Sequence, residues 1–116
     1  MISLFAAAML VATPINVPPA KAGECKWIHG RYAVYNGAGV RRIWVIGTHR
    51  IIDLDNGDDV PAIVKYEQHL ADYEGKKDGL FGDFFVCAVE NSRPGWMQLV
   101  HLVRAKNLIF RGKPFG

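Results

Sequence analysis

The stretch LFGDFFVCAV, residues 80–89, decides the fold class of this 116-residue chain. Its apolar residues stand at neighbouring as well as alternate positions, so both faces of an extended backbone are apolar there. A strand with two apolar faces is typical of a central position in a sheet. We therefore expect a mainly β domain built around residues 80–89.

The segments on either side of this strand alternate between strand patterns and turn signals. The remaining strands are expected over residues 26–35, 40–46, 49–54, 96–104 and 108–111, with a tight connection at 105–107. One short helix is expected after Asp58 or Asp59, with Pro61 in its first turn and its end near Tyr73. About six strands and one helix predict a small OB-like or SH3-like barrel, or a sandwich, with the helix at one end.

The front of the chain has the pattern of a secretory signal peptide. The apolar run at residues 4–11 is shorter than the roughly 20 residues that span a bilayer, and it leads to the small-x-small site Ala20-Lys21-Ala22. We expect cleavage after Ala22, which gives a signal peptide at 1–22, one β-rich domain at 23–111 and a flexible tail at 112–116. The expected localisation is periplasmic or secreted, with no membrane span after cleavage.

Two cysteines, Cys25 and Cys87, follow the expected cleavage site. An even number of cysteines in an oxidising compartment predicts a disulfide bond, which stabilises by about 4 kcal/mol in the chain-entropy model. A metal site is the alternative, because His29 follows Cys25 closely and His101 can approach Cys87 across neighbouring strands. No second tight ligand pair completes a zinc motif. The sequence therefore predicts the disulfide, with no metal and no cofactor.

The acidic loop at residues 53–59 invites a calcium interpretation. Counted from Asp53, however, the glycine falls at position 5 and position 12 is Val64, whereas an EF-hand loop needs glycine at 6 and glutamate at 12. A solvated turn and helix cap is the expected structure, and a calcium site of another kind stays open.

Charged residues within the expected strands supply the candidate binding site. Strand parity places Arg41 or Arg42 on a face with large apolar groups, so one of them needs an acidic partner, and Asp83 is the carboxylate most in need of a cation. A structural pair involving Asp83 is favoured over an anion site. The candidate ligand-binding residues are Arg31, Arg42, Trp44, His49, Arg50 and Asp83.

The sequence contains no motif that fixes a reaction. It has no Gly-x-Ser-x-Gly elbow, no His-Glu-x-x-His pair and no phosphate-binding glycine pattern, so enzyme activity is uncertain and a non-enzymatic role is favoured. The net charge of +3 gives no strong nucleic-acid signal. We expect a binding or protein-interaction module whose partner is an envelope protein or a small anionic ligand. The alternative is a small hydrolase, or an anion- or oligonucleotide-binding protein, that uses His49, Arg50 and Asp83.

Short motifs along the chain support export. The elements HGR (29–31), YNG (35–37), RIW (42–44), GTHR (47–50) and GDFFVC (82–87) resemble a group of small exported bacterial proteins of uncharacterised function. The resemblance covers residues 25–104. It implies export to the bacterial envelope and the disulfide, and it assigns no catalytic or binding residue.

Overall fold

The computed structural model describes residues 16–35, 40–55, 60–71 and 79–116. Within these ranges the chain forms a mainly β structure with one helix, as expected. The elements are β1 (Cys25–Tyr35), β2 (Val40–Val45), β3 (Ile51–Leu54), α2 (Pro61–Ala71), β4 (Leu80–Ala88), β5 (Leu99–Phe110) and β6 (Lys113–Pro114).

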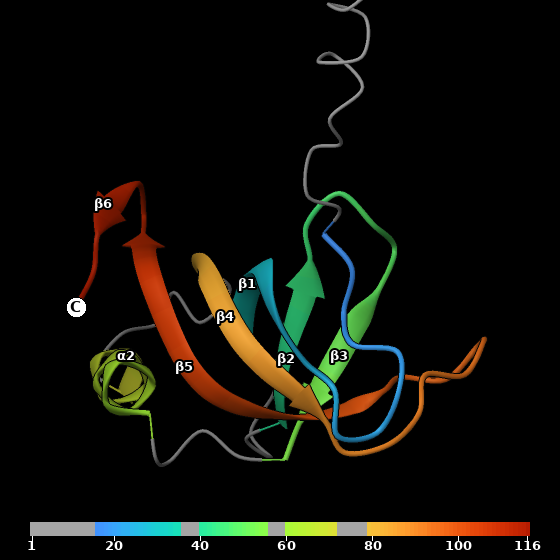
Figure 1. Cartoon of the computed structure of the whole chain (residues 1–116). Coiled ribbons are helices and arrows are strands. Elements are labelled where there is room, and N and C mark those ends of the chain that lie inside the picture. Colours follow the sequence, from blue (N-terminus) through green and yellow to red (C-terminus); the bar gives the residue numbers. More distant parts are fainter. Residues whose placement is uncertain (1–15, 36–39, 56–59, 72–78) are drawn as a thin grey trace, which may run out of the picture.

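Five of the strands close into a barrel (Figure 1). The long strand β1 pairs with β2 along one edge and with β4 along the other, and β3 closes the circuit by pairing in parallel with β5. The resulting order is β1-β2-β3-β5-β4, with α2 between β3 and β4 in the chain. This is a small Greek-key barrel of the OB-like kind, with β6 added beside β5.

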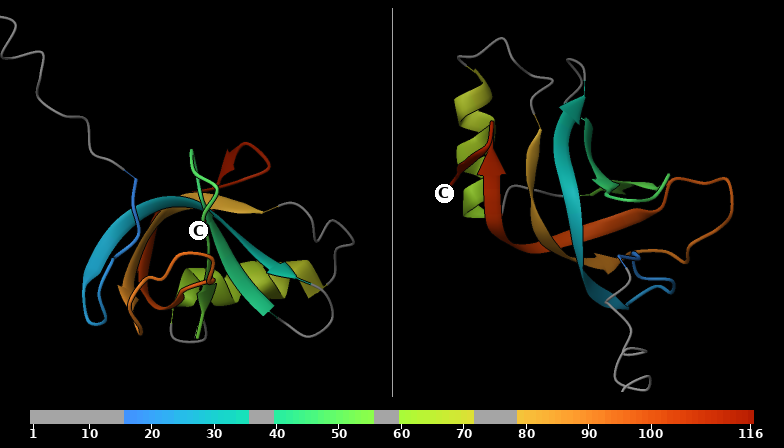
Figure 2. Two further views of the ribbon diagram at one scale, coloured as in Figure 1. Left: turned by 90° about the vertical axis from the view of Figure 1, so that its right-hand side faces the viewer. Right: turned by 90° about the horizontal axis from the view of Figure 1, so that it is seen from above.

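The barrel interior is filled by aromatic and aliphatic side chains from every strand of the circuit. Tyr32, Ile43, Phe84 and Leu102 have no exposed surface. Tyr66 joins them from α2, and its ring meets that of Tyr32 edge-on at a centroid distance of 5.8 Å. The helix thus covers one opening of the barrel with its apolar side (Figure 2).

Two opposing glycines allow the strands to come close together. Gly30 of β1 lies directly opposite Gly82 of β4. A Cβ atom at Gly82 would lie 2.6 Å from Leu108 Cδ2 and 3.0 Å from the Lys106 carbonyl oxygen, so β5 could not pack where it does against any larger residue.

The C-terminal part of the chain differs from the prediction in two ways. Residues 105–107 are not a connection, because β5 runs without interruption from Leu99 to Phe110. Two register shifts against β4 bend it around the barrel instead, and Asn107 takes a φ of 53° at one of them. The tail expected to be flexible at 112–116 is also held: β6 pairs with β5, and the backbone of Phe115 donates a hydrogen bond to the Leu108 carbonyl.

The N-terminal end of the described chain forms a strap over the barrel, here defined as residues 16–24. Pro18 and Pro19 are buried, and Asn16 binds the backbone of β1. The buried side chain of Gln98 donates a hydrogen bond of 2.9 Å to the Pro19 carbonyl. Residues 16–22, which the sequence pattern assigns to the leader, therefore make specific contacts with the domain.

The predicted disulfide is present. Cys25 and Cys87 lie opposite each other on β1 and β4, with an S–S distance of 2.07 Å. The bond joins the first strand of the barrel to a strand 62 residues later. The protein is a disulfide-bonded β-barrel.

Candidate functional site

The outer surface of β1, β4 and β5 carries a cluster of rings and cations that the barrel interior does not use. Trp27 faces Phe85 across the strand pair, and Phe85 faces Arg104 across the next. The Trp27 and Phe85 ring centroids lie 5.2 Å apart, and the guanidinium carbon of Arg104 lies 5.2 Å from the Phe85 centroid and 5.7 Å from that of Trp27. We call this set, together with Lys106, the outer cluster.

Lys106 completes the outer cluster and lies two residues after Arg104 on β5, opposite Asp83. Its ammonium nitrogen lies 4.2 Å from the centroid of the Trp27 ring, within the range of a cation–π interaction. A groove of about 450 Å³ lies beside these side chains, between β5 and the start of α2. Its walls are formed by Trp27, Val60, Pro61, Ala62, Val103, Arg104, Ala105 and Lys106.

The two cations of the outer cluster are stacked on aromatic rings. Among the ion pairs between described residues, neither Arg104 nor Lys106 has a carboxylate partner. Trp27 remains 38% exposed although it packs against Phe85. The groove therefore combines an accessible aromatic surface with the cations Arg104 and Lys106, of which Lys106 also lies opposite the Asp83 carboxylate.

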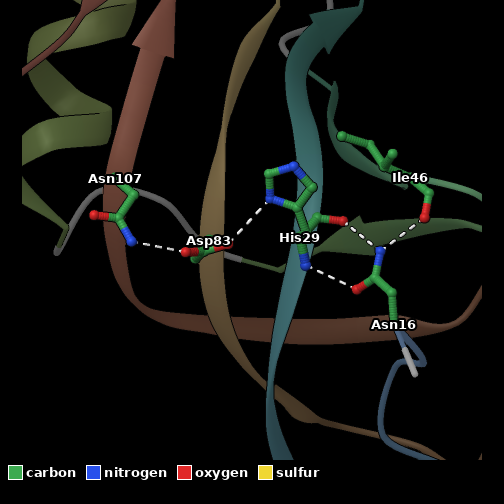
Figure 3. A network of polar contacts seen from close by, with 5 residues as sticks. All are labelled: Asn16, His29, Ile46, Asp83 and Asn107. Carbon is green, nitrogen blue, oxygen red and sulfur yellow. Dashed lines mark hydrogen bonds and ion pairs between the residues drawn. The ribbon is translucent and has the colours of Figure 1, made fainter. Parts of the chain in front are cut away.

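A polar network lies beside the outer cluster, with Asp83 directly opposite Lys106 in the strand register (Figure 3). The Nδ1 atom of His29 lies 3.0 Å from Asp83 Oδ1, and the side-chain amide of Asn107 donates a 2.8 Å hydrogen bond to Asp83 Oδ2. Asn16 accepts a hydrogen bond from the His29 backbone amide and donates to the carbonyl oxygens of His29 and Ile46. The second ring nitrogen of His29 points away from Asp83 (Figure 3).

The Asp83 carboxylate is held ionised by this network. Partial burial raises the pKa of Asp83, but the hydrogen bonds from Asn107 and His29 and the charges of His29 and Lys106 outweigh it and hold the pKa below its usual range. An ionised Asp83 accepts a hydrogen bond from the protonated Nδ1 of His29, and this bond fixes the orientation of the imidazole ring.

Asp83 does not have the partner expected from the sequence. The arginine on the apolar face is Arg41, and its guanidinium binds Glu67 of α2 with Nε–Oε2 and Nη2–Oε1 distances of 2.7 and 3.0 Å. The buried hydroxyl of Tyr32 donates to the same carboxylate, and burial together with that contact raises the pKa of Tyr32. The predicted pairing of Asp83 with an arginine is wrong because a helix residue, remote in sequence, supplies the acid.

The predicted residues Arg31, Arg42 and Trp44 lie on another part of the outer surface. Arg31 is the cross-strand neighbour of Trp44, and Arg42 is the neighbour of Asp53. The indole nitrogen of Trp44 donates a 2.8 Å hydrogen bond to the Thr48 carbonyl, which fixes the turn after β2. Trp44 therefore has a structural partner within its own hairpin.

The remaining predicted residues do not gather around one point. Arg50 binds the Ser92 hydroxyl and the Gln98 side-chain oxygen, at 3.2 and 3.4 Å. Asp83 binds His29 and Asn107, and His49 lies exposed in the turn before Arg50. Within the described residues, His49, Arg50 and Asp83 do not share a hydrogen-bond network, and the histidine beside Asp83 is His29.

The candidate residues predicted from the sequence do not include Trp27, Phe85, Arg104 or Lys106. The alternation of buried and partly exposed residues along β4 shows that Phe85 points out of the barrel. Its partners on β1 and β5 follow only from the strand register, which residue spacing does not provide.

No family model, curated protein or solved structure matched the chain significantly in the three comparisons with known proteins.

The acidic turn considered for calcium lies partly at residues 56–59, outside the described ranges. Elsewhere in the described structure, no group of three or more histidine, cysteine or acidic side chains is arranged to hold a metal ion. None of the helices described here has the length and hydropathy needed to cross a bilayer.

Proposed function

We propose that this protein is an exported binding module that takes a small anionic ligand on its outer cluster. The observation that carries the proposal is the pair of cations, Arg104 and Lys106, stacked on the exposed Trp27–Phe85 surface, neither of them in an ion pair with a described carboxylate. A flat ligand ring would stack on Trp27, and its carboxylate or phosphate would meet the two cations.

The size of the groove supports a small ligand. Its volume of about 450 Å³ falls within the range of small-molecule sites. The adjacent imidazole of His29, oriented by Asp83, offers a hydrogen-bonding nitrogen at the edge of the cluster. An anionic sugar and an anionic nucleotide present the same chemistry to these groups, namely a stacking surface beside a negative charge.

The test is a calorimetric titration with two matched pairs of probes: AMP with adenosine, and trigalacturonate with maltotriose. The anionic member of at least one pair should bind more tightly than its neutral partner. The double variant Arg104→Ala/Lys106→Ala should weaken that binding about tenfold or more. Arg93→Ala, which removes a cation stacked on a different tryptophan, is the control and should leave it unchanged. Equal binding of charged and neutral probes, or an equal loss in the control, would contradict the proposal.

Export is the second part of the proposal. The Cys25–Cys87 bond is consistent with an oxidising compartment. The contacts of Asn16, Pro19 and Ala20 with the barrel favour a leader that is cut upstream of Asn16, because cleavage after Ala22 would remove them.

Intact mass of the protein from its native envelope fraction, measured with and without reductant and alkylation, tests this part. The expected product retains residues 16–22 and lacks the two thiol hydrogens. A product that begins at Gly23 would contradict the upstream cut, and an uncleaved chain with free thiols would contradict export.

A further inference from the structure

The connection between β4 and β5 exposes a tryptophan that the fold does not bury. Trp96 is 63% exposed, the largest value among the exposed large apolar side chains in the described part of the chain. Met97 and Val89, in the same connection, are 40% and 47% exposed. This loop extends from the barrel on the side away from α2 (Figure 1). We define residues 91–97 as the tip loop.

The tip loop is held in one conformation by its backbone. The Trp96 amide donates a 3.2 Å hydrogen bond to the Arg93 carbonyl, Pro94 occupies the second turn position, and Gly95 has a φ of 79°. These are the features of a type II turn, which needs glycine at its third position. The guanidinium carbon of Arg93 lies 4.5 Å from the centroid of the Trp96 ring. Tryptophan and arginine are thus presented together on a preorganised turn.

The base of the tip loop is anchored to the strap. The Ser92 amide donates to the Ala20 carbonyl at 2.8 Å, and the Ala22 amide donates to Asn91 Oδ1 at 2.9 Å. Gln98, only 1% exposed, donates to the carbonyl oxygens of Pro19 and Glu90. These contacts leave Trp96 outside the packed structure, so its exposure does not follow from any need of the barrel.

The tip of this surface carries a single charged side chain, and that charge is positive. Arg93 is the only charged residue of the tip loop, and exposed Lys21 lies between the two strap residues that bind it. The nearest acids along the chain, Glu24 and Glu90, lie at the base of the loop, where they accept hydrogen bonds from the Ala20 and Leu99 amides. An exposed tryptophan and methionine flanked by cations suit the interface of a lipid bilayer with anionic headgroups.

The structure points to the tip loop as a membrane-docking element. Trp96 and Met97 enter the headgroup region of an anionic bilayer, while Arg93 and Lys21 meet the lipid phosphates. This inference is independent of the proposed ligand site, because it uses neither Trp27 nor the cations beside it.

The test uses the disulfide-bonded protein and two kinds of vesicle, phosphatidylcholine alone and phosphatidylcholine mixed with phosphatidylglycerol. Co-sedimentation with the mixed vesicles is expected and should weaken as salt is added. A Trp27→Phe/Trp44→Phe variant leaves Trp96 as the sole tryptophan, and its emission should shift to shorter wavelength on binding. Trp96→Ala should reduce the bound fraction severalfold, and Arg93→Ala should reduce it less.

Trp27→Ala is the matched control, because it removes another exposed tryptophan and should sediment like the unaltered protein. Circular dichroism of each variant separates loss of binding from loss of fold. The inference is overturned if the protein does not sediment with mixed vesicles, if Trp96→Ala binds them as well as the unaltered protein does, or if both kinds of vesicle bind equally. If Trp27→Ala abolishes sedimentation instead, the membrane contact belongs to the outer cluster, and the inference about the tip loop is overturned as well.

Discussion

Phe84 and Phe85 are neighbours in β4 with opposite environments. Phe84 points into the barrel and has no exposed surface, whereas Phe85 points outward and packs against Trp27 and Arg104. The interior ring is explained by the fold, because burial of a large apolar side chain is what stabilises a small domain. The outer ring packs within a cluster of exposed aromatic surface and cationic side chains. Burial thus distinguishes side chains that the fold requires from exposed side chains that are available to bind a ligand.

The largest expected effect comes from replacing Phe84 and Phe85 separately with alanine. Phe84→Ala should lower the free energy of unfolding by about 3–5 kcal/mol, because it leaves a cavity in a closed core. Phe85→Ala should cost about 1 kcal/mol, the scale of a cross-strand contact on an exposed face. Urea unfolding of both variants checks the prediction. Similar losses for the two would show that the outer ring is as much a part of the core as the inner one.

The polar contacts inside the barrel opening provide the next test. Glu67→Ala removes the acceptor of the buried Tyr32 hydroxyl and the partner of Arg41, so a loss of about 1–3 kcal/mol is expected. Adding Tyr32→Phe should recover part of that loss, since it removes the hydroxyl that was left without an acceptor. A double variant that is less stable than Glu67→Ala alone would contradict this explanation.

Gln98 tests whether the strap belongs to the folded domain. Gln98→Ala removes hydrogen bonds to the Pro19 and Glu90 carbonyls, and we expect a loss of about 1–2 kcal/mol. A chain that starts at Gly23 lacks Pro19, so Gln98→Ala should lower its unfolding free energy by less than it does in the longer chain. Equal losses in the long and short chains would mean that the Gln98 contact with Pro19 contributes nothing to stability.

The smallest expected effect belongs to Asp83 on the outer surface. Because the folded protein holds the pKa of Asp83 below its usual range, its contribution to stability is complete above the ordinary value of about 4 and is lost as the pH falls through the folded value. Asp83→Asn should therefore cost less than about 1 kcal/mol at neutral pH, and the difference from the unaltered protein should shrink below about pH 4. Thermal unfolding across this range checks the sign, and a difference that grows on acidification would contradict it.

Much of the barrel could be predicted from local patterns. The apolar run at residues 80–89 identified the central strand, and the cysteines identified the disulfide because an even pair in a chain expected to be exported has one simple outcome. The continuity of β5 could not be predicted, since residues 105–107 carry turn-like Lys-Asn chemistry and only the bulges opposite β4 show that the strand continues.

The candidate site was harder to predict than the fold. Arg41 needed an acid, but the sequence suggested a strand neighbour, and Glu67 reaches it from a helix that packs over the barrel opening. The outer cluster draws Trp27, Phe85 and Arg104 from three strands that are far apart in the chain. Such a site depends on strand order and register, which are set by tertiary packing rather than by local residue spacing.

The stability and the ligand affinity of one variant, Trp27→Ala, together show whether the outer cluster serves binding or folding. If the outer cluster serves binding rather than folding, this change should cost about 1 kcal/mol or less of unfolding free energy and weaken binding of the preferred anionic probe about tenfold. A stability loss as large as that of Phe84→Ala, with probe affinity unchanged, would contradict a binding role for the outer cluster.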